Sequence, residues 1–494
     1  MAVSVLHSSH TLLTTQHSSH SISHFSQHIN TSHIPRVPVA PQEFKRLLYG
    51  LCFFHAVIQE RLKFGPLGWN VQYQFSVPDF IISARQLQMF LNEYADALPL
   101  KVLTYLTGEC NYGGRVTDAK DRRTMASLLA IYYNEAVATA EGHALSPSGR
   151  YVVPPDGEHE SYLAFIRALP FTAEPEVFGL HANADITKDQ QETDRMLDSL
   201  LRTQSQSTAG AGMSKERVLE ELAADILARV PQPFDVEAAR WRYPVDYHES
   251  MNTVLTQELV RFNWLLEVIH ATLADLRKAL KGLVVMSGDL EAVGNAMFDG
   301  KVPKVWKDKS YPSIKPLGSY VNDLCERLAM FRGWVDGGAP VVFWMSGFFF
   351  THAFLTGVKQ NFARKGRVPI DTVAWNFRCL PRGDPDKRPA DGAYVTGLFL
   401  EGARWDYGAM RLDESEPKVL FSAAPLLLLQ PARADEADDY PHYECPLYVT
   451  TERKGVLQTT GHSSNFVMDV RLPSDQAQDH WIRRGVALML SLPD

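Results

Sequence analysis

The chain has 494 residues, 45% of them apolar and 11% aromatic, which is the composition of a globular protein with two to four domains. Its formal net charge of −8 comes from interspersed signs, so the sequence lacks the basic surface expected of a nucleic-acid-binding protein. No run of about 18 consecutive apolar residues occurs, and no membrane span is predicted.

The first 43 residues have an unusual composition. Residues 1–41 contain nine Ser and seven His and no acidic residue, and their apolar residues show no period. We predict a disordered tail or an incorrect gene start, with metal binding by the His-rich tract as the alternative. Neither a secretory signal nor a transit peptide fits this composition.

Helical patterns begin near Phe44. The segment Leu47–Ile58 is apolar nearly all round and predicts a buried helix. Ser83 is the expected N-cap of a second helix, and Asp118 the expected cap of a third over 121–133. Residues 143–175 are rich in Pro and Gly and predict an ordered irregular loop.

The strongest helical signal lies beyond an expected flexible linker at 204–213, and a domain boundary is expected within 185–213. A helix over 251–284 is predicted, with Ser250 as its cap and apolar residues at alternating spacings of four and three. This stripe fits either an oligomeric coiled coil or a helix packed within its own domain. We favour the second because further apolar residues widen the stripe, namely Val254, Leu265 and Val268.

The apolar period changes from helical to strand-like after Asp371. Short strands are predicted at 394–401, 418–421, 426–429, 446–450, 466–472 and 486–492. In one of them Phe466, Met468, Val470 and Leu472 share a face, which predicts burial inside a small antiparallel β-barrel over 380–494. Arg404 and Trp405 are candidates for joining this barrel to the helices, the alternative being ordinary surface and core residues.

Catalytic motifs are absent from the sequence. It contains no G-x-x-x-x-G-K-[ST] loop for phosphates, and no G-x-G-x-x-G, G-x-S-x-G or H-E-x-x-H pattern. Thr460–Ser464 is interpreted as a polar turn, and Asp118 with Asp121 as charges at a helix N-terminus. No catalytic, cofactor-binding or metal-binding residue is therefore predicted.

The five cysteines, Cys52, Cys110, Cys325, Cys379 and Cys445, lie far apart in sequence and are expected to be buried, reduced thiols. Dense aromatic segments also fill 309–321, 343–357 and 360–365. Within them Trp344 is predicted to be a core residue rather than part of a ligand cage.

These aromatic segments resemble the C-terminal region of axonemal dynein heavy chains, and the resemblance covers about Phe44 to Asp494. Further segments that carry the resemblance include Phe-Gly-Pro-Leu-Gly-Trp-Asn at 64–70 and Gly-Leu-Phe-Leu-Glu-Gly-Ala-Arg-Trp-Asp at 397–406. The others are Phe53–Ala56, Gln59–Arg61, Gly108–Asp118, Phe178–His181, Asn183–Ile186, Ser250–Leu255, Lys281–Ser287, Thr459–Ser463 and His480–Ile482. The sequence of Thr187–Thr193 resembles that of inner-arm dynein heavy chains.

The resemblance implies an α+β multidomain fold. Residues 44–185 would be the helical lid of the sixth AAA+ module, 190–379 the helical part of the dynein C-terminal domain, and 380–494 its β-barrel part. Such a region belongs to an ATP-driven, minus-end-directed microtubule motor for ciliary and flagellar movement. It would lie in the cytoplasm, within the cytoskeleton of the axoneme.

The family's partners would be the rest of the motor ring, with intermediate chains, light chains and microtubules bound through the parent complex. ATP and Mg belong to the complete motor, whereas the nucleotide-binding modules and the microtubule-binding stalk are missing from this sequence. Three hypotheses follow: a structural and regulatory end piece of a motor, a free-standing interaction protein that docks on a dynein ring, or an unrecognised enzyme. The missing catalytic motifs argue against the third.

Overall fold

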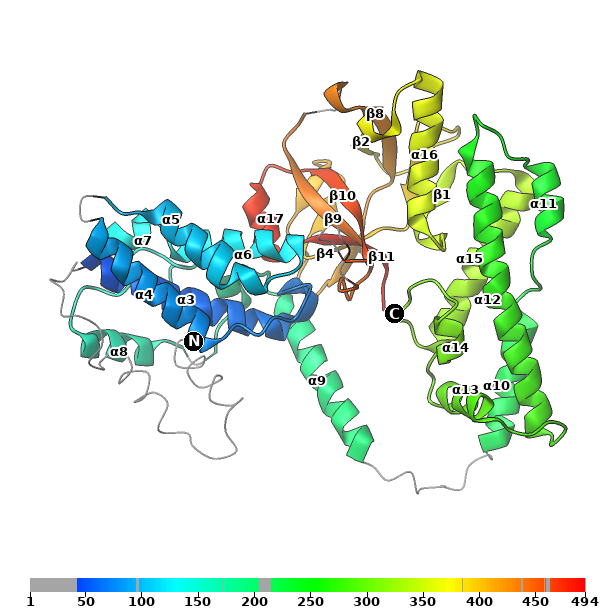
Figure 1. Ribbon diagram of the computed structural model, residues 1–494, viewed down its shortest axis with the longest axis horizontal. Helices are drawn as coiled ribbons and strands as arrows, with labels where there is room; N and C mark the ends of the chain where they lie inside the picture. The colour runs from blue at the N-terminus through cyan, green and yellow to red at the C-terminus, as the bar shows by residue number, and fades with distance from the viewer. Residues whose placement is uncertain are drawn as a thin grey trace.

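The computed structural model describes residues 42–94, 97–170, 172–203, 215–383, 385–436, 439–456, 458 and 463–493. The expected tail at 1–43, apart from its last two residues, and the expected linker at 204–213 lie outside these ranges. Figure 1 shows strands in the middle of the molecule, with one group of helices on each side. Among the described helices, none is both long and apolar enough to cross a membrane.

The first group of helices forms the N-terminal helical domain (residues 42–183). Its α3 has ten buried residues and is the central helix, as its nearly uniform apolar pattern predicts. The elements are α3 (Gln42–Glu60), η1 (Arg61–Leu67), α4 (Val77–Glu93), α5 (Leu100–Tyr105), η2 (Leu106–Asn111), η3 (Gly113–Arg115), α6 (Ala119–Tyr132), α7 (Glu135–Thr139), α8 (His159–Ala168) and η4 (Pro175–Phe178). α9 (Ala184–Thr203) then leads away from this domain.

Two predictions in this domain are wrong. Ser83 lies inside α4, where its hydroxyl donates to the Asp79 carbonyl, and the helix starts instead at a capping box of Ser76 and Asp79. The predicted loop at 143–175 contains α8, whose apolar residues pack against the core of the domain. By contrast, Asp118 caps α6 as predicted.

The second group of helices surrounds α12 (Ser250–Leu280), a helix of 31 residues. α12 contacts every other α-helix of the group, as Figure 1 illustrates along its length. These are α10 (Lys215–Arg229), α11 (Val236–Arg242), α13 (Gly288–Phe298), α14 (Lys304–Lys307), α15 (Leu317–Gly337) and α16 (Thr351–Gly366).

The apolar stripe of α12 is buried within the chain's own core. Leu259, Leu266 and Leu273 are 0% exposed, and the additional Leu265 is also fully buried. This packing fits the internal-helix interpretation and leaves no coiled-coil seam on α12. The predicted end is wrong, because Leu283 lies beyond the helix and is 73% exposed.

The predicted cap of α12 is also displaced by one residue. The side chain of Glu249 accepts a bond from the Met251 amide, and Ser250 is the first helical residue.

The strands form two larger sheets and a small ribbon. The orders are β1-β3-β8-β2, β10-β9-β11-β4-β7 and β5-β6. The strands are β1 (Val342–Trp344), β2 (Val373–Cys379), β3 (Ala393–Thr396), β4 (Phe399–Glu401), β5 (Arg404–Asp406), β6 (Arg411–Asp413), β7 (Phe421–Ala423), β8 (Leu427–Arg433), β9 (His442–Thr450), β10 (Phe466–Pro473) and β11 (Ala487–Ser491). Short η5 (Met345–Gly347), η6 (Ile370–Thr372), η7 (Ala434–Glu436) and α17 (Gln478–Arg484) connect them.

The predicted antiparallel barrel is not confirmed. β1 pairs with β3 in parallel and β11 pairs with β9 in parallel, and the described strands do not close into one ring. The predicted strand at 394–401 is divided between the two sheets at Gly397, which has φ +82°. A Cβ at Gly397 would lie 2.2 Å from the Trp344 ring, so only glycine fits this corner.

The predicted apolar face of β10 is confirmed only in part. Val470 and Leu472 are buried, whereas Phe466 and Met468 are only partly buried. An irregularity in the pairing with β9 lies between Phe466 and Met468, and it brings Val467 into the core. One continuous core of buried residues extends from α10 through the sheets to β11.

Candidate functional site

The first turn of α6 is held by two buried carboxylates. Asp118 accepts bonds from the amides of Lys120 at 2.9 Å and Asp121 at 3.1 Å, which satisfies the free N–H groups at the helix start. Asp121 accepts from the amides of Asn70 at 2.9 Å and Val71 at 3.0 Å. It also accepts from the Tyr73 hydroxyl at 2.9 Å, so this carboxylate fixes the turn that follows η1.

The same turn of α6 contacts the five-stranded sheet. The Asn70 amide group donates to Asp118 at 3.2 Å and to the hydroxyl of Tyr448 on β9 at 2.9 Å. Lys120 pairs with Asp469 on β10 at 2.6 Å. A further cation, Arg123, donates to the Tyr443 hydroxyl and to the Glu444 carbonyl, both at 3.1 Å.

We call this set of contacts the seam. It comprises Arg61, Asn70, Asp118, Lys120 and Arg123 of the N-terminal helical domain, and Tyr443, Tyr448, Asp469 and Arg483 of the sheet and α17.

Arg61 is the buried cation of the seam and is 0% exposed. Its guanidinium donates to the carbonyls of Leu67 at 3.1 Å, Gly68 at 3.2 Å and Arg483 at 3.2 Å, and also to the Phe178 carbonyl. Burial lowers the pKa of Arg61 to about 10, which leaves it charged at neutral pH. One charge therefore joins η1, η4 and the end of α17.

The backbones of η1 and the α17 end approach closely beside Arg61. Gly485 has φ +69°, and a Cβ there would lie 2.5 Å from the Leu67 carbonyl oxygen. Any larger residue would push the two segments apart.

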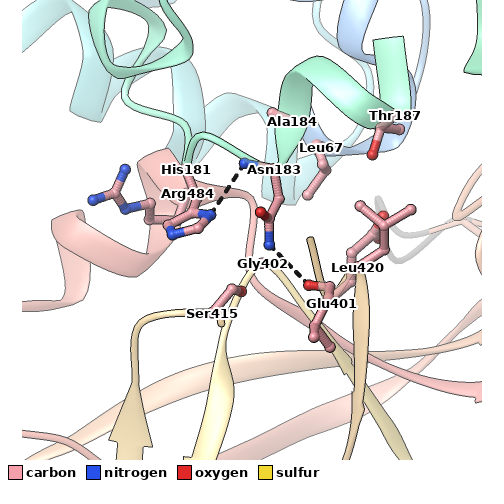
Figure 2. A pocket seen from close by; sticks show the side chains of 11 residues that line it. Leu67, His181, Asn183, Ala184, Thr187, Glu401, Gly402, Ser415, Leu420 and Arg484 are labelled. Atoms are coloured by element: carbon pink, nitrogen blue, oxygen red, sulfur yellow. Dashed lines mark hydrogen bonds between the residues drawn. The ribbon is translucent and has the colours of Figure 1, made fainter. Parts of the chain in front are cut away.

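A small cavity lies at one end of the seam, and Figure 2 shows the side chains around it. Asn183 is the main polar residue: its amide group donates to the carbonyls of Glu416 at 2.8 Å and Val419 at 2.9 Å, and its oxygen accepts from the Lys418 amide at 2.8 Å. The cavity volume is about 10 Å³, which is the size of one water molecule. It cannot hold a nucleotide.

A charged cluster closes this end of the seam. Glu414 accepts from the His480 ring at 2.8 Å and from Arg484 at 3.0 Å, and Arg484 donates to the Leu180 carbonyl at 2.7 Å. Burial alone would raise the pKa of Glu414, but His480 and Arg484 outweigh it and lower this pKa. Burial lowers the pKa of the adjacent His181, so its ring stays neutral at pH 7.

The two sides of the seam coincide with two matched protein families. Residues 44–184 match the AAA lid domain of dynein heavy chains, and residues 190–490 match the C-terminal domain of dynein heavy chains. The chain belongs to the dynein heavy chain family.

Similar curated proteins are axonemal members of this dynein family. The chain is 52% identical over 453 residues to mouse dynein axonemal heavy chain 3, which covers 92% of this chain and 11% of the relative. It is 52% identical over 452 residues to human dynein axonemal heavy chain 12 (91% and 15%), and 49% over 453 residues to rat dynein axonemal heavy chain 1 (91% and 10%). It therefore spans only a small part of the length of these relatives.

In dynein terms, the seam connects the AAA lid to the C-terminal domain. The contacts that cross the seam are hydrogen bonds and an ion pair, and they range from buried (Asn70 to Tyr448) to exposed (Arg123 to the Glu444 carbonyl). Breaking a buried one leaves a polar group without its partner. The seam is thus the junction between the two regions that match dynein families.

The candidate residues of this dynein chain have structural positions. Asp118 is the predicted helix cap, but Asp121 is a buried acceptor rather than a surface charge. Ser463 and Ser464 bond to nearby backbone in a turn, while 459–462 lie outside the described residues. Within the described ranges, no group of three or more His, Cys, Asp and Glu side chains could hold a metal ion.

Two other predictions need correction. Trp344 is only half-buried, and the guanidinium of Arg327 lies 5.6 Å from its ring, so a cation is present beside it. All five cysteines are free, but Cys110 is exposed and only Cys445 is fully buried.

Arg404 and Trp405 do not join the helices to the sheet. Arg404 pairs with Asp413 on the neighbouring strand β6, and Trp405 is a core residue. Arg483 and Arg484, which the sequence did not single out, form a different junction, because they bond to the N-terminal helical domain.

Most seam residues were missed because a lone Arg, Asn or Tyr carries no periodic signal. A signal for some of these residues was nevertheless present in the sequence segments that resemble dynein heavy chains. Three seam residues, Arg61, Asn70 and Asp118, each lie in one of these segments, and so does Asn183 at the cavity beside the seam.

Proposed function

We propose that this chain serves as the C-terminal structural and regulatory part of an axonemal dynein heavy chain. The parent would be an ATP-driven, minus-end-directed microtubule motor of the cilium or flagellum, located in the axonemal cytoskeleton. The names of the relatives and the two family matches support this role. The inner-arm assignment remains a prediction.

The observation that carries the proposal is the seam. A lid that moves with its AAA+ module would carry the C-terminal domain with it, because Asn70, Lys120 and Arg61 bind the sheet and α17 directly. The C-terminal domain would then tune the motor without touching nucleotide.

The domain division proposed for this role follows the sequence: a lid at 44–185, a helical part at 190–379 and a strand-rich part at 380–494. Strands β1 and β2 precede residue 380, and the helices and sheets share one core. We therefore propose that the last two parts act as one body. Its partners would be the rest of the ring and, through the parent complex, intermediate chains, light chains and microtubules.

Loosening the seam should alter movement but not basal catalysis. In a complete heavy chain that contains this sequence, the pair Asn70→Ala and Lys120→Ala should change microtubule gliding velocity or processivity while leaving basal ATP turnover in place. The physical reason is that both changes remove bonds to β9 and β10 and touch no nucleotide site.

The matched control is Lys304→Ala, which breaks an ion pair with Asp308 at the exposed surface outside the seam. Gliding should be unchanged in this variant. Loss of nucleotide binding in the seam variant, with the ring still folded, would show that the domain has a different role.

The isolated chain should not hydrolyse ATP. The physical reason is that the sequence contains no P-loop, whose backbone amides and lysine would hold the phosphates. Phosphate release by the purified chain should equal that of buffer, with a P-loop ATPase as the positive control. Turnover that persists through a second purification would overturn this expectation.

The alternative function is a free-standing interaction protein that docks on a dynein ring. Exposed apolar residues at the turn after α12 favour a protein contact there, with Leu283 at 73% and Val285 at 87% exposed. A transcript that continues in frame upstream into AAA+ motifs would decide for the motor part.

A further inference from the structure

A groove outside the seam has a volume of about 530 Å³. It lies between the start of α12, the C-terminal half of α16 and the segment 388–393. Its floor is apolar and includes Met251, Phe343 and Val358, each less than 10% exposed. We call it the basic groove because four cations line its sides.

The framework of the basic groove is rigid. The side chain of Asn361 accepts from the Ser250 amide at 2.7 Å and donates to Glu249 at 2.9 Å, which ties α16 to the start of α12. On the opposite side, a Cβ at Gly392 would lie 2.2 Å from the Leu429 carbonyl oxygen, so the backbone at Gly392 is seated directly on β8. The groove is therefore part of the fold and needs no rearrangement to form.

Its positive charge is only partly neutralised. Lys365 pairs with Asp391 at 2.7 Å, and Glu249 is occupied by the Asn361 amide and the first turn of α12. Arg364 donates to the Tyr247 carbonyl and the Ser250 hydroxyl.

Arg388 likewise donates to a carbonyl, that of Ala339, and not to an acid. Over the described part of the chain, neither these two guanidinium groups nor that of Arg367 forms an ion pair. The excess is local, since the whole chain has a net charge of −8.

Arg367 adds an independent observation. It ends α16 in the left-handed conformation, with φ 50° and ψ 43°, where glycine is the favoured residue. An arginine there costs free energy relative to glycine. Strain of this kind is often retained where a side chain is needed, and here the exposed Arg367 side chain lines the groove.

We propose that the basic groove binds an acidic peptide segment that also carries apolar side chains. Carboxylates of the peptide pair with Arg364, Arg367 and Arg388, whose guanidinium groups suit bidentate binding. Apolar side chains of the peptide cover the floor of Met251, Phe343 and Val358. A single inorganic anion would leave this floor and most of the volume unused. The inference does not depend on the role of the chain in a motor.

The test uses the full chain and fluorescence anisotropy with a labelled peptide that alternates glutamate with leucine and phenylalanine. Two matched peptides replace all glutamates by glutamine, or all apolar residues by alanine. The parent peptide should bind, each matched peptide should bind at least about tenfold more weakly, and added salt should weaken binding. Equal binding of the glutamine peptide would overturn the proposal, as would inorganic pyrophosphate binding as tightly as the peptide.

Variants locate the binding. Arg367→Gly relieves the left-handed backbone, so this variant should fold with an equal or higher melting temperature and yet bind the peptide about tenfold more weakly. The triple change Arg364→Ala, Arg367→Ala and Arg388→Ala should abolish binding. The control variant replaces three cations outside the groove, Arg85, Lys101 and Lys301, by alanine. It should bind the peptide as tightly as the unmodified protein does. Equal losses in the control and the groove variants would show that only net charge matters, which contradicts the proposal.

Discussion

Leu266→Ala is expected to lower the free energy of unfolding by about 2–5 kcal/mol, as for a large-to-small change in a packed core. Leu266 is 0% exposed in the middle of α12, which contacts all the neighbouring helices of its group. Removal of its isobutyl group would leave a cavity that rigid helices on several sides cannot fill. Urea unfolding followed by tryptophan fluorescence measures the change.

Leu283→Ala is the matched control, because Leu283 is 73% exposed just beyond the end of the same helix. The same chemical change there should alter stability by no more than about 0.5 kcal/mol. Sedimentation provides a second test. If the unmodified chain sedimented as a dimer and Leu266→Ala converted it into folded monomers, the coiled-coil interpretation of α12 would be correct instead.

Asp121 is expected to make the protein less stable as the pH rises from about 4 to about 7. Burial, and secondarily the charge of Asp118, raise the pKa of Asp121 from 3.8 to about 7, against the opposing effect of its three hydrogen bonds. In this window the folded chain retains a proton that the unfolded chain has lost. The unfolding free energy therefore falls with rising pH, by up to about 4 kcal/mol at 1.36 kcal/mol per pKa unit.

The measurement is urea unfolding of the parent and of Asp121→Asn at pH 4.5 and pH 7.5. The variant cannot ionise at this position, so the difference between the two proteins isolates this effect. That comparison is needed because burial lowers the pKa of His55 to about 4, which makes stability rise with pH between about 4 and 6.5. Asp275→Asn, at an exposed position, should keep the slope of the parent. An unchanged slope in Asp121→Asn would show that Asp121 titrates normally in the folded chain.

The sequence predicted those parts of the fold that depend on local signals. The cap at Asp118, the apolar stripe of α12 and the positions of β8 to β11 each follow from a few adjacent residues. Their period and capping chemistry are set within one element, so the rest of the chain is not needed to predict them.

The predictions failed where distant segments decide the structure. Parallel pairing of β9 with β11 joins residues about 40 apart, and the bend at Gly397 depends on the position of Trp344 in space. The same reason explains the missed seam, since Arg61 bonds to Arg483 across more than 400 residues. The sequence segments that resemble the dynein family contain three of the nine seam residues, Arg61, Asn70 and Asp118, but nothing in the spacing of these segments indicated that they meet.

The order of the five-stranded sheet has a consequence for biosynthesis. β11 is the last of its strands in the sequence, yet it lies in the middle of the sheet between β9 and β4. While the ribosome is still translating, β9 with β10 and β4 with β7 exist only as separate halves with open edges. The five-stranded sheet can form completely only after β11 has left the ribosome. A stop codon shortly before Ala487 would therefore remove the central strand of the sheet and leave two unpaired strand edges that favour aggregation.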